Sequence, residues 1–529
     1  MWYPTVSDSG GSAMSADGRD AGPSGTEGAT SAEKLAREIR RRRKLADLSQ
    51  ERLASLLGFT RQYLGAIENP NRGVASADVV AAIDAKLDAN GALVALQAVA
   101  QAERRARRRS RSEGSSGATA LASTTVVAVT PAVQVETAMP LDPYDELNCS
   151  GRLDTTVRVL AQLSGWEMDR RQFLTNAAFA AASFAEPALF ALTAQPDERI
   201  ARTVGARVGM TDVEIAIDNI AHLRKLDHRY GSGRIRRQVV QLLNSTAGLL
   251  ASGSYSERVG KALVGAVGQA TWLAGSMASD ISNYSLAQRY YVQTLNLAVS
   301  AGDRRYAANV LSHMSRLVVQ RGHAARSDEE RIRHARQAVS LARAGKMIAQ
   351  NSTTPVLAAL LDAVEARGHA LTGEPRATRE AVLRAERHYG QARLGDEPHW
   401  LSFYTEAELA ADLGRCLRDA GEPTEATQLI ARALGSYEPW RVRSRCFVQT
   451  DLAAAHLVRG DHEHAAALGH DAVSTAMQVS SDRVRDRLGT LQWQLRGLGS
   501  DSRSTRELDG RISELLTRAP SDNEGDPTR

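Results

Sequence analysis

Apolar residues recur at helical spacing over most of this chain. Near the N-terminus, Leu53 and Leu57 lie four positions apart, and Leu64 and Ile67 lie three apart. Residues at these spacings share one face of a helix, so each pair marks an apolar stripe. The pattern predicts two short amphipathic helices that follow each other closely in the chain.

The residues between these two stripes favour a tight turn. Gly58 stands where the first helix would end, and Thr60 stands where the second would be capped. Two short helices with a turn of about three residues are what a reader of the DNA major groove requires. We therefore expect the chain to bind double-stranded DNA. A helical hairpin with no role in DNA binding is the alternative.

A helical pattern also fills the C-terminal half. From residue 201 to 518 one helical segment follows another, punctuated by Gly, and no stretch shows the sustained alternation of a strand. Residues 413–434 and 452–473 echo each other, with Gly421 and Gly460 at an offset of 39 (460 − 421). We expect an all-α chain: a small N-terminal five-helix domain, a linker, and a solenoid of helix pairs.

The echo resembles a degenerate tetratricopeptide (TPR) repeat, in which a helix, a Gly-containing turn and a second helix form one unit. Its offset exceeds the usual TPR period of about 34 residues. An irregular helical bundle is the alternative.

The N-terminal segment resembles the Cro/CI-type (XRE) helix-turn-helix family. The residues that carry this resemblance are Arg43, Leu48, Ser49, Gln50, Leu53, Ala54, Leu57, Gly58, Leu64, Ile67 and Glu68. The resemblance implies that Ser49 caps the second helix and that Arg43 pairs with Glu68. Two departures stand out. Asp47 occupies a position where the family prefers Gly, and Asn69-Pro70-Asn71 replaces the usual Gly after Glu68.

The same resemblance implies which residues meet DNA. Contacts to base edges would come from Arg61, Gln62 and Gly65 at the start of the third helix, Arg being suited to guanine and Gln to adenine. Contacts to phosphates would come from Gln50, Arg42, Thr60 and Tyr63.

The positions of the charged residues support a nucleic-acid partner more strongly than the net charge does. The net charge of the 529-residue chain is only +5, but six basic residues lie in Arg37–Lys44 and six arginines in Arg104–Arg111. Such clusters attract phosphate backbones. The alternative is an ordinary solvated helix face or tail. Aromatic residues make up 5% of the chain, which fits closely packed helices rather than sheets.

The residues that could support catalysis or metal binding are sparse. The three cysteines (Cys149, Cys416 and Cys446) have no metal-ligand spacing, and they suit a reducing cytoplasm. His462 and His464 are two positions apart, which points them in different directions on a helix. No phosphate-binding loop or hydrolase motif appears in the sequence. We expect no enzyme activity, no cofactor and no metal.

Composition divides the chain into segments. We expect a disordered leader (1–30), a helix-turn-helix domain (31–109), a linker (110–165), an apolar connecting segment (166–200), a TPR-like domain (201–518) and a disordered tail (519–529).

The connecting segment carries Arg170-Arg171-Gln172-Phe173-Leu174, which matches a twin-arginine export motif. Because export signals are N-terminal, we favour a helix that packs on the next domain, with Phe173 and Leu174 buried. Membrane attachment and an unusual targeting role remain as alternatives. We expect a cytoplasmic protein associated with the nucleoid and not with a membrane.

The first helices of TPR pairs line a concave surface, where polar residues at helical spacing can hold a peptide. Two sets fit this description: Tyr306, Asn309, His313 and Arg316, and Tyr404, Glu408, Asp412 and Arg415. They predict a groove for a peptide or protein ligand. A solvated helix face is the alternative.

An XRE-type reader joined to a TPR-like array resembles two kinds of regulator. One is the actinobacterial regulators of differentiation and antibiotic production, and the other is the peptide-pheromone receptors of Gram-positive bacteria. We favour the first, acting as a repressor and as a homodimer formed through the TPR-like domain. The alternative from another class is a TPR scaffold with a weak or vestigial DNA-binding domain.

Overall fold

The structure is a computed structural model. It describes residues 30–57, 61–69, 77–87, 89, 91–100, 103, 147, 152–168, 179–197, 200–497 and 502–518. The chain forms two compact units, residues 1–134 and 135–529. Within the described ranges both units are helical, and the only β-type pairings are two isolated bridges, Arg202 with Tyr255 and Arg207 with Ser254. The expected all-α fold is confirmed.

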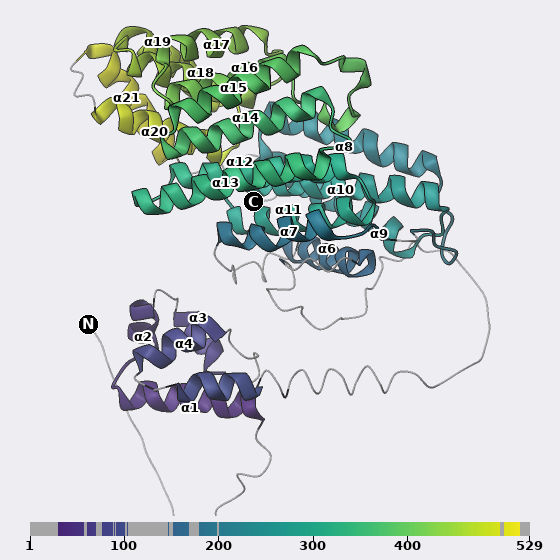
Figure 1. The fold of residues 1–529 in the computed structure, drawn as a ribbon. Coiled ribbons are helices and arrows are strands. Elements are labelled where there is room, and N and C mark those ends of the chain that lie inside the picture. The colour runs from purple at the N-terminus through teal and green to yellow at the C-terminus, as the bar shows by residue number, and fades with distance from the viewer. Residues whose placement is uncertain are drawn as a thin grey trace, which may run out of the picture. The chain divides into compact units, whose positions relative to one another are not determined.

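The N-terminal unit is a small helical domain. Its helices are α1 (Ser31–Leu45), α2 (Gln50–Leu57), α3 (Arg61–Ile67) and α4 (Ala77–Lys86), followed by a helical stretch at 92–100 (Figure 1). The stripe residues predicted from the sequence form its core. Leu53, Leu64 and Ile67 are buried together with Ile39 and Ile83, and Leu57 packs against them half-buried.

The C-terminal unit is a long array of helices. They are α6 (Leu153–Met168), α7 (Ala185–Thr193), α8 (Met210–Tyr230), α9 (Ser232–Ser252), α10 (Glu257–Asp280), α11 (Tyr284–Ser300), α12 (Arg304–His323), α13 (Asp328–Ala349), α14 (Pro355–Thr372), α15 (Pro375–Gly390), α16 (Glu406–Asp419), α17 (Pro423–Ser436), α18 (Val442–Val458), α19 (His462–Ala476), α20 (Asp482–Gly497) and α21 (Arg503–Thr517). Three short 3-10 turns, η2 (Ala181–Phe184), η3 (Leu394–Asp396) and η4 (His399–Leu401), complete it.

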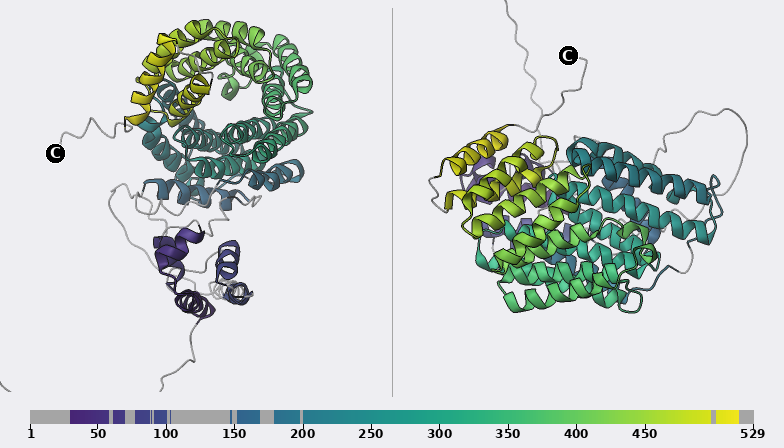
Figure 2. Two further views of the ribbon diagram at one scale, coloured as in Figure 1. Left: turned by 90° about the vertical axis from the view of Figure 1, so that its left-hand side faces the viewer. Right: turned by 90° about the horizontal axis from the view of Figure 1, so that it is seen from above.

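From α8 onward the helices form consecutive antiparallel pairs. The first helix of each pair packs on its own partner and on the first helix of a neighbouring pair, as α12, α14, α16 and α18 do. In Figure 2 the pairs curl into a ring, and α8 and α10 at its start meet α18 and α20 near its end. The array is therefore a repeat-like stack of helix pairs whose two ends pack on each other.

The turns inside three pairs share one geometry. Gly373, Gly421 and Gly460 all have φ between 76° and 87°, a left-handed conformation that glycine adopts without strain. In each turn the amide of the next residue donates to a carbonyl five positions earlier, at 2.8 to 3.0 Å. The offset from Gly373 to Gly421 is 48 rather than 39, because residues 391–405 separate α15 from α16. The repeat is therefore structural but irregular in length.

The structure differs from the expected linker at 110–165. Residues 153–165 belong to α6, which packs on α9 and α11, with Val157, Leu160 and Leu163 buried. These apolar residues recur at three-residue spacing and make α6 part of the C-terminal core.

The connecting segment contains α7, which packs on α11 and α13, with Phe184 of η2 and Ala188 buried. A helix in this segment therefore packs on the C-terminal unit, beginning at Ala185. Phe173, Leu174 and the arginine pair lie outside the described residues. Among the helices that the structure describes, none combines the length and the apolar character that crossing a membrane requires.

Candidate nucleic-acid interface

The turn from α1 into α2 is set by local hydrogen bonds. Asp47, at the position where the family prefers Gly, has φ of 52°, a left-handed conformation that Asp tolerates better than most residues. The amide of Leu48 donates to the carbonyl of Arg43 at 3.1 Å, which closes the turn. Ser49 Oγ accepts from the amide of Arg52 at 3.0 Å and caps α2, as expected. These contacts fix where α2 begins.

A buried ion pair joins α1 to the end of α3. Arg43 Nε and Nη2 donate to the two carboxylate oxygens of Glu68 at 2.5 and 2.9 Å, and the side chains are only 9% and 3% exposed. The hydrogen bonds that Arg43 donates to Glu68 raise the pKa of Arg43. The pair expected from the sequence is confirmed, and it is the bidentate, buried kind that strongly constrains geometry.

Two further hydrogen bonds extend this pair into a four-way junction. Arg43 Nη1 donates to the carbonyl of Leu48 at 2.7 Å, and Gln50 Nε2 donates to Glu68 at 2.8 Å. The end of α1, the α1–α2 turn, the start of α2 and the end of α3 thus meet around the Arg43–Glu68 ion pair. We call Arg43, Leu48, Gln50 and Glu68 the Glu68 junction. It fixes the angle at which α3 stands against α2.

The first residue of α3 is free to meet a partner. Arg61 is exposed, whereas Leu64 on the same helix is fully buried in the core. Gly65 is half-buried, and a Cβ built there would lie 3.9 Å from the Gln50 side chain. The side chains of Gln62 and Tyr63, and all of Thr60, lie outside the described residues. Among the residues expected to contact bases, Arg61 therefore has the clearest position for this role.

Two residues expected to contact phosphates have partners inside the domain. Gln50 donates to Glu68, and Arg42 Nε donates to Glu38 at 2.8 Å. Hydrogen bonds from Arg41 and Arg42 lower the pKa of Glu38 to about 2. The remaining basic residues of the first cluster are exposed: Arg37, Arg40, Arg41 and Lys44. The cluster Arg104–Arg111 lies outside the described residues.

The second predicted site, on the C-terminal unit, is assembled but buried. Arg316 of α12 forms an ion pair with Asp412 of α16, and Tyr404 OH donates to the same carboxylate at 3.4 Å. Arg415 bridges Asp412, at 2.5 Å, to Asp451 of α18, at 2.9 Å. Asp412 is fully buried, and Arg316 and Arg415 lower its pKa against the opposing effect of burial. The two sets of residues therefore meet, in a packed ionic network.

The other members of the two sets are also largely covered. Tyr306 and Asn309 are buried, and Glu408 accepts from Arg441 at 2.9 Å. His313 lies with its ring centroid 4.8 Å from that of Trp272. These side chains therefore do not lie on a solvated helix face, the alternative that the sequence had left open.

Sequence reasoning missed the aromatic residues that pack beside His313. Phe403, from the segment between α15 and α16, has its ring 5.7 Å from His313 and 6.2 Å from Trp272. The guanidinium of Arg224 lies 5.0 Å from the Phe403 ring and 5.2 Å from the Trp272 ring. The scarcity of aromatic residues was the one available signal, because a rare Trp or Phe in an Ala-rich array is usually buried.

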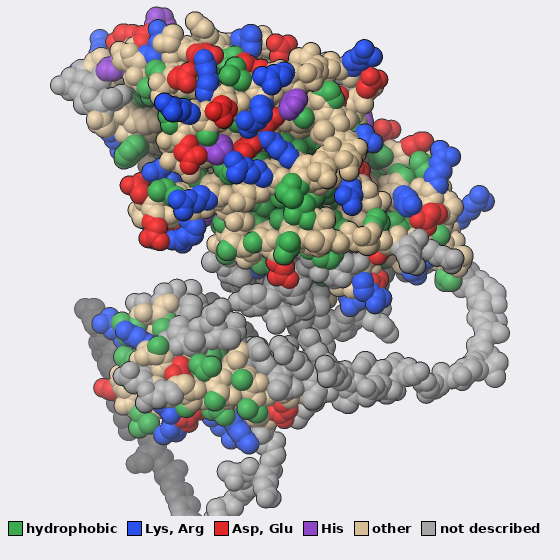
Figure 3. Space-filling view, in the orientation of Figure 1, with side chains coloured by type: hydrophobic (Ala, Val, Ile, Leu, Met, Phe, Trp, Pro, Cys, Tyr) green, Lys and Arg blue, Asp and Glu red, His purple; other side chains and the backbone are tan. Residues whose placement is uncertain are grey.

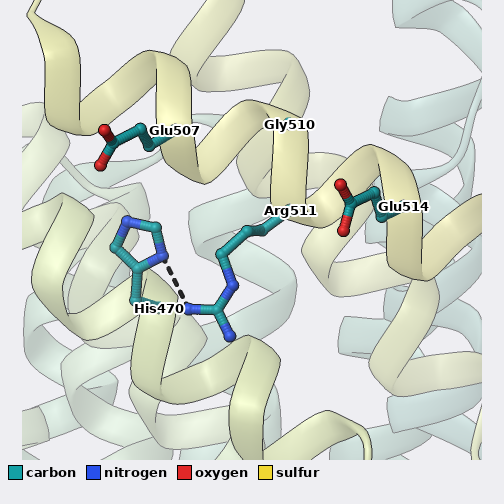
Figure 4. Close-up of a pocket in the computed structure, with 5 residues that line it drawn as sticks. All are labelled: His470, Glu507, Gly510, Arg511 and Glu514. Atoms are coloured by element: carbon teal, nitrogen blue, oxygen red, sulfur yellow. Dashed lines mark hydrogen bonds between the residues drawn. The ribbon is translucent and has the colours of Figure 1, made fainter.

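A shallow depression of about 480 Å³ lies between α19 and α21. Figure 4 shows its lining, His470, Glu507, Gly510, Arg511 and Glu514, with Arg511 bonded to the His470 ring at 3.0 Å. On the face drawn in Figure 3, Lys/Arg and Asp/Glu side chains are interspersed over the C-terminal unit. That face shows no continuous basic surface for a phosphate backbone.

The comparisons with known proteins agree with this assignment. A family model described as a helix-turn-helix domain matches residues 34–97. The match covers α1 from its fourth residue, α2 to α4 and most of the helical stretch that follows, including the whole Glu68 junction. No curated protein matches the chain. The chain thus carries a helix-turn-helix domain, which supports DNA binding and a role in transcription regulation.

Proposed function

We propose that this protein is a sequence-specific transcriptional regulator whose N-terminal unit is an XRE-type reader of double-stranded DNA. The observation that carries the proposal is the Glu68 junction inside a matched helix-turn-helix domain. It holds α3 at a fixed angle to α2 and leaves Arg61, at the start of α3, exposed. A rigid helix with an exposed Arg at its N-terminal end is suited to the major groove.

Specificity in this proposal rests on two kinds of contact. Arg61 supplies paired donors that match the O6 and N7 atoms of guanine, and Gln62 is the candidate for adenine. The exposed basic residues of α1 add attraction to phosphates, which is strong but carries no sequence information. The proposed operator therefore has a guanine at a fixed position in each half-site.

The C-terminal unit is proposed to dimerise the protein and to bind a peptide or protein. Groove readers of this type work in pairs on half-sites about one DNA turn apart, and a single small reader covers only one half-site. The network around Asp412 offers charged and aromatic groups, but Asp412 itself is fully buried, and Phe403 lies beside His313 at its edge. In this proposal a peptide reaches Asp412 only when the segment 391–405 moves aside.

A repressor of differentiation or secondary metabolism in an actinobacterium is the role we infer. Its support is the resemblance of the composition and of the paired architecture to such regulators. The competing function is that of a scaffold. The scaffold function is favoured by size, because the helical array is far larger than the DNA-binding domain, which has fewer than a hundred residues.

Sequencing of genomic fragments recovered on the purified full-length protein separates these functions. We expect a recurring, two-fold symmetric motif, enriched over random fragments and retained at physiological salt. A Glu68→Ala variant serves as the control because it breaks the junction that orients α3. Recovery of fragments with no shared motif, or equal recovery by the variant, would favour the scaffold.

A further inference from the structure

The turn between α18 and α19 gathers three metal-binding side chains. Gly460 has φ of 80°, and the amide of Asp461 donates to the carbonyl of His456 at 3.0 Å. This tight reversal places the last turn of α18 beside the first turn of α19. His456 comes from the first helix and His464 from the second, and Asp461 lies between them.

The donor atoms of these residues converge. His456 Nδ1 lies 3.1 Å from one oxygen of Asp461, and His464 Nδ1 lies 2.9 Å from the other. The two imidazole rings are stacked with centroids 5.5 Å apart. One ligand atom from each residue lies within 4.8 Å of the other two. The cluster therefore offers two nitrogens and a carboxylate oxygen around one point.

A related turn shows what the third residue adds. In the α14–α15 turn, His369 Nδ1 lies 2.7 Å from Glu374, and these residues hold the same places around Gly373 as His456 and Asp461 hold around Gly460. A His–acid pair across the turn thus recurs as a means of closing it. The position matching His464 is Ala377. The α18–α19 turn therefore has a third donor that closing the turn does not require.

His464 is also not needed for packing. Its side chain is 74% exposed, whereas those of His456 and Asp461 are 14% and 35% exposed. The position is thus open to an ion from solvent, and two of the three ligands are held by the fold. The sequence pattern draws attention to His462 and His464, which are two positions apart. His456 lies eight positions before His464, and the two become neighbours only through the turn.

We propose that His456, Asp461 and His464 form a binding site for a divalent transition metal of the Zn²⁺ class. Imidazole nitrogen and carboxylate oxygen are ordinary Zn²⁺ ligands, at about 2.0–2.2 Å. Tetrahedral ligands at that range lie about 3.3 Å from one another. The two Nδ1–oxygen distances are already close to this value, so a rotation of the exposed His464 ring completes the set. Water fills the fourth position.

Binding at this site would pin the end of α18 to the start of α19. Each imidazole would give up its Nδ1 contact to Asp461 and bind the ion with the nitrogen lone pair. The inference goes beyond DNA recognition, because it adds an inorganic ligand to the C-terminal unit. It also runs against the expectation from the sequence that the chain has no metal site.

Zn²⁺ titration of the chelator-treated full-length protein, in competition with a chromophoric chelator, tests the proposal. We expect one tight equivalent in the native chain and a loss of at least about tenfold in affinity for His464→Ala. His464→Ala removes an exposed side chain, so the fold is expected to survive. His462→Ala is the matched control, with the same substitution in the same turn, and we expect it to keep the native affinity.

Thermal unfolding supplies a second measurement. Zn²⁺ should raise the melting temperature of the native chain and of His462→Ala by the same amount, and should raise that of His464→Ala by less. Substitution of Co²⁺ reports the coordination number through its visible absorption. Three results would overturn the proposal: no stoichiometric binding, equal affinity in the native chain and His464→Ala, or a loss confined to His462→Ala.

Discussion

Arg443 at the start of α18 forms a buried, bidentate ion pair with Asp227 in the last turn of α8, 216 residues earlier in the chain. The two nitrogen–oxygen distances are 2.8 and 2.6 Å, and Arg443 Nη1 also lies 3.0 Å from Asp280 of α10. Burial lowers the pKa of Arg443, but the two carboxylates outweigh it and raise that pKa. This pair joins the first and the later helix pairs of the ring.

The first prediction follows from that contact. Arg443→Ala leaves two buried carboxylates without their cation, so we expect a loss of about 3–5 kcal/mol in the free energy of unfolding. Urea unfolding followed by circular dichroism measures it. The control is Arg503→Ala, because Arg503 pairs with Glu507 on the surface, at 90% and 55% exposure. It should not change the unfolding midpoint, and a midpoint shift equal to that of Arg443→Ala would refute the role of ring closure.

A close approach between helices gives the second prediction. A Cβ added at Gly414 of α16 would lie 2.5 Å from Ile430 Cγ1 and 3.2 Å from the Ala426 carbonyl oxygen, both of α17. Gly414→Ala should therefore cost about 1–3 kcal/mol through overpacking. Gly248 lies inside α9 with nothing within 4 Å of its built Cβ. Gly248→Ala should raise stability by up to about 1 kcal/mol. If both variants raise the free energy of unfolding, then α16 and α17 can separate slightly at no cost in stability.

The features that the sequence predicted correctly are local ones. The stripe residues Leu53 and Leu64 follow from helical periodicity alone. The α2 cap at Ser49 also depends on neighbours within a few positions, although it was the family resemblance that implied it. The Arg43–Glu68 pair is longer in range, and it came from the family pattern rather than from a physical derivation.

The features that the sequence did not reveal depend on tertiary contacts. Nothing near Arg443 indicates that Asp227 is its partner, because the ring must close before the two residues meet. The same holds for Phe403, which reaches back over Trp272 from a connecting segment. Helix α6 could have been found, since Val157, Leu160 and Leu163 carry a helical stripe. Its Ser- and Thr-containing surroundings concealed that signal.

The third prediction concerns acid stability. Burial, with Arg316 and Arg224 nearby, lowers the pKa of His313 well below its usual value. Above about pH 6.5 the ring is neutral in both the folded and the unfolded state and contributes nothing to the pH dependence. Below that value the unfolded chain binds a proton that the folded chain does not. Stability should therefore fall as the pH drops from about 6.5, by up to about 1.4 kcal/mol per pH unit.

His313→Leu isolates this effect because it removes the titrating ring and keeps an apolar side chain beside Trp272. We expect a shallower loss of stability between pH 6.5 and 5 than in the native chain. His369 acts in the opposite direction, since the hydrogen bond that its ring donates to Glu365 raises its pKa. Its contribution is present below the unfolded pKa and is lost as the pH rises through the raised value. An unchanged slope in His313→Leu would show that the His313 ring is solvated.

The fourth prediction tests the Glu68 junction. Glu68→Ala removes the partner of the buried Arg43 and of Gln50, so local stability should fall by about 3–5 kcal/mol. Hydrogen exchange of the α1–α3 amides in the full-length protein measures this loss without separating the two units. Arg41 is the matched control on α1, since it pairs with Glu38 and is 59% exposed. If the α1–α3 amides exchange equally fast in Glu68→Ala and Arg41→Ala, the Glu68 junction does not stabilise this domain.

The last prediction separates base readout from phosphate contact. Arg61→Ala should weaken binding to the specific operator by about 1–3 kcal/mol and relax the preference for one base position, with little effect on random DNA. Arg37 carries the same charge and is exposed on α1, where it pairs with Glu33. Arg37→Ala should therefore weaken operator and random DNA alike and reduce the salt dependence of both. Fluorescence anisotropy at two salt concentrations, with the operator and with a scrambled duplex, makes the comparison. If Arg61→Ala lowers affinity for both duplexes by the same factor, Arg61 contacts only phosphate, and the readout must come from other residues of α3.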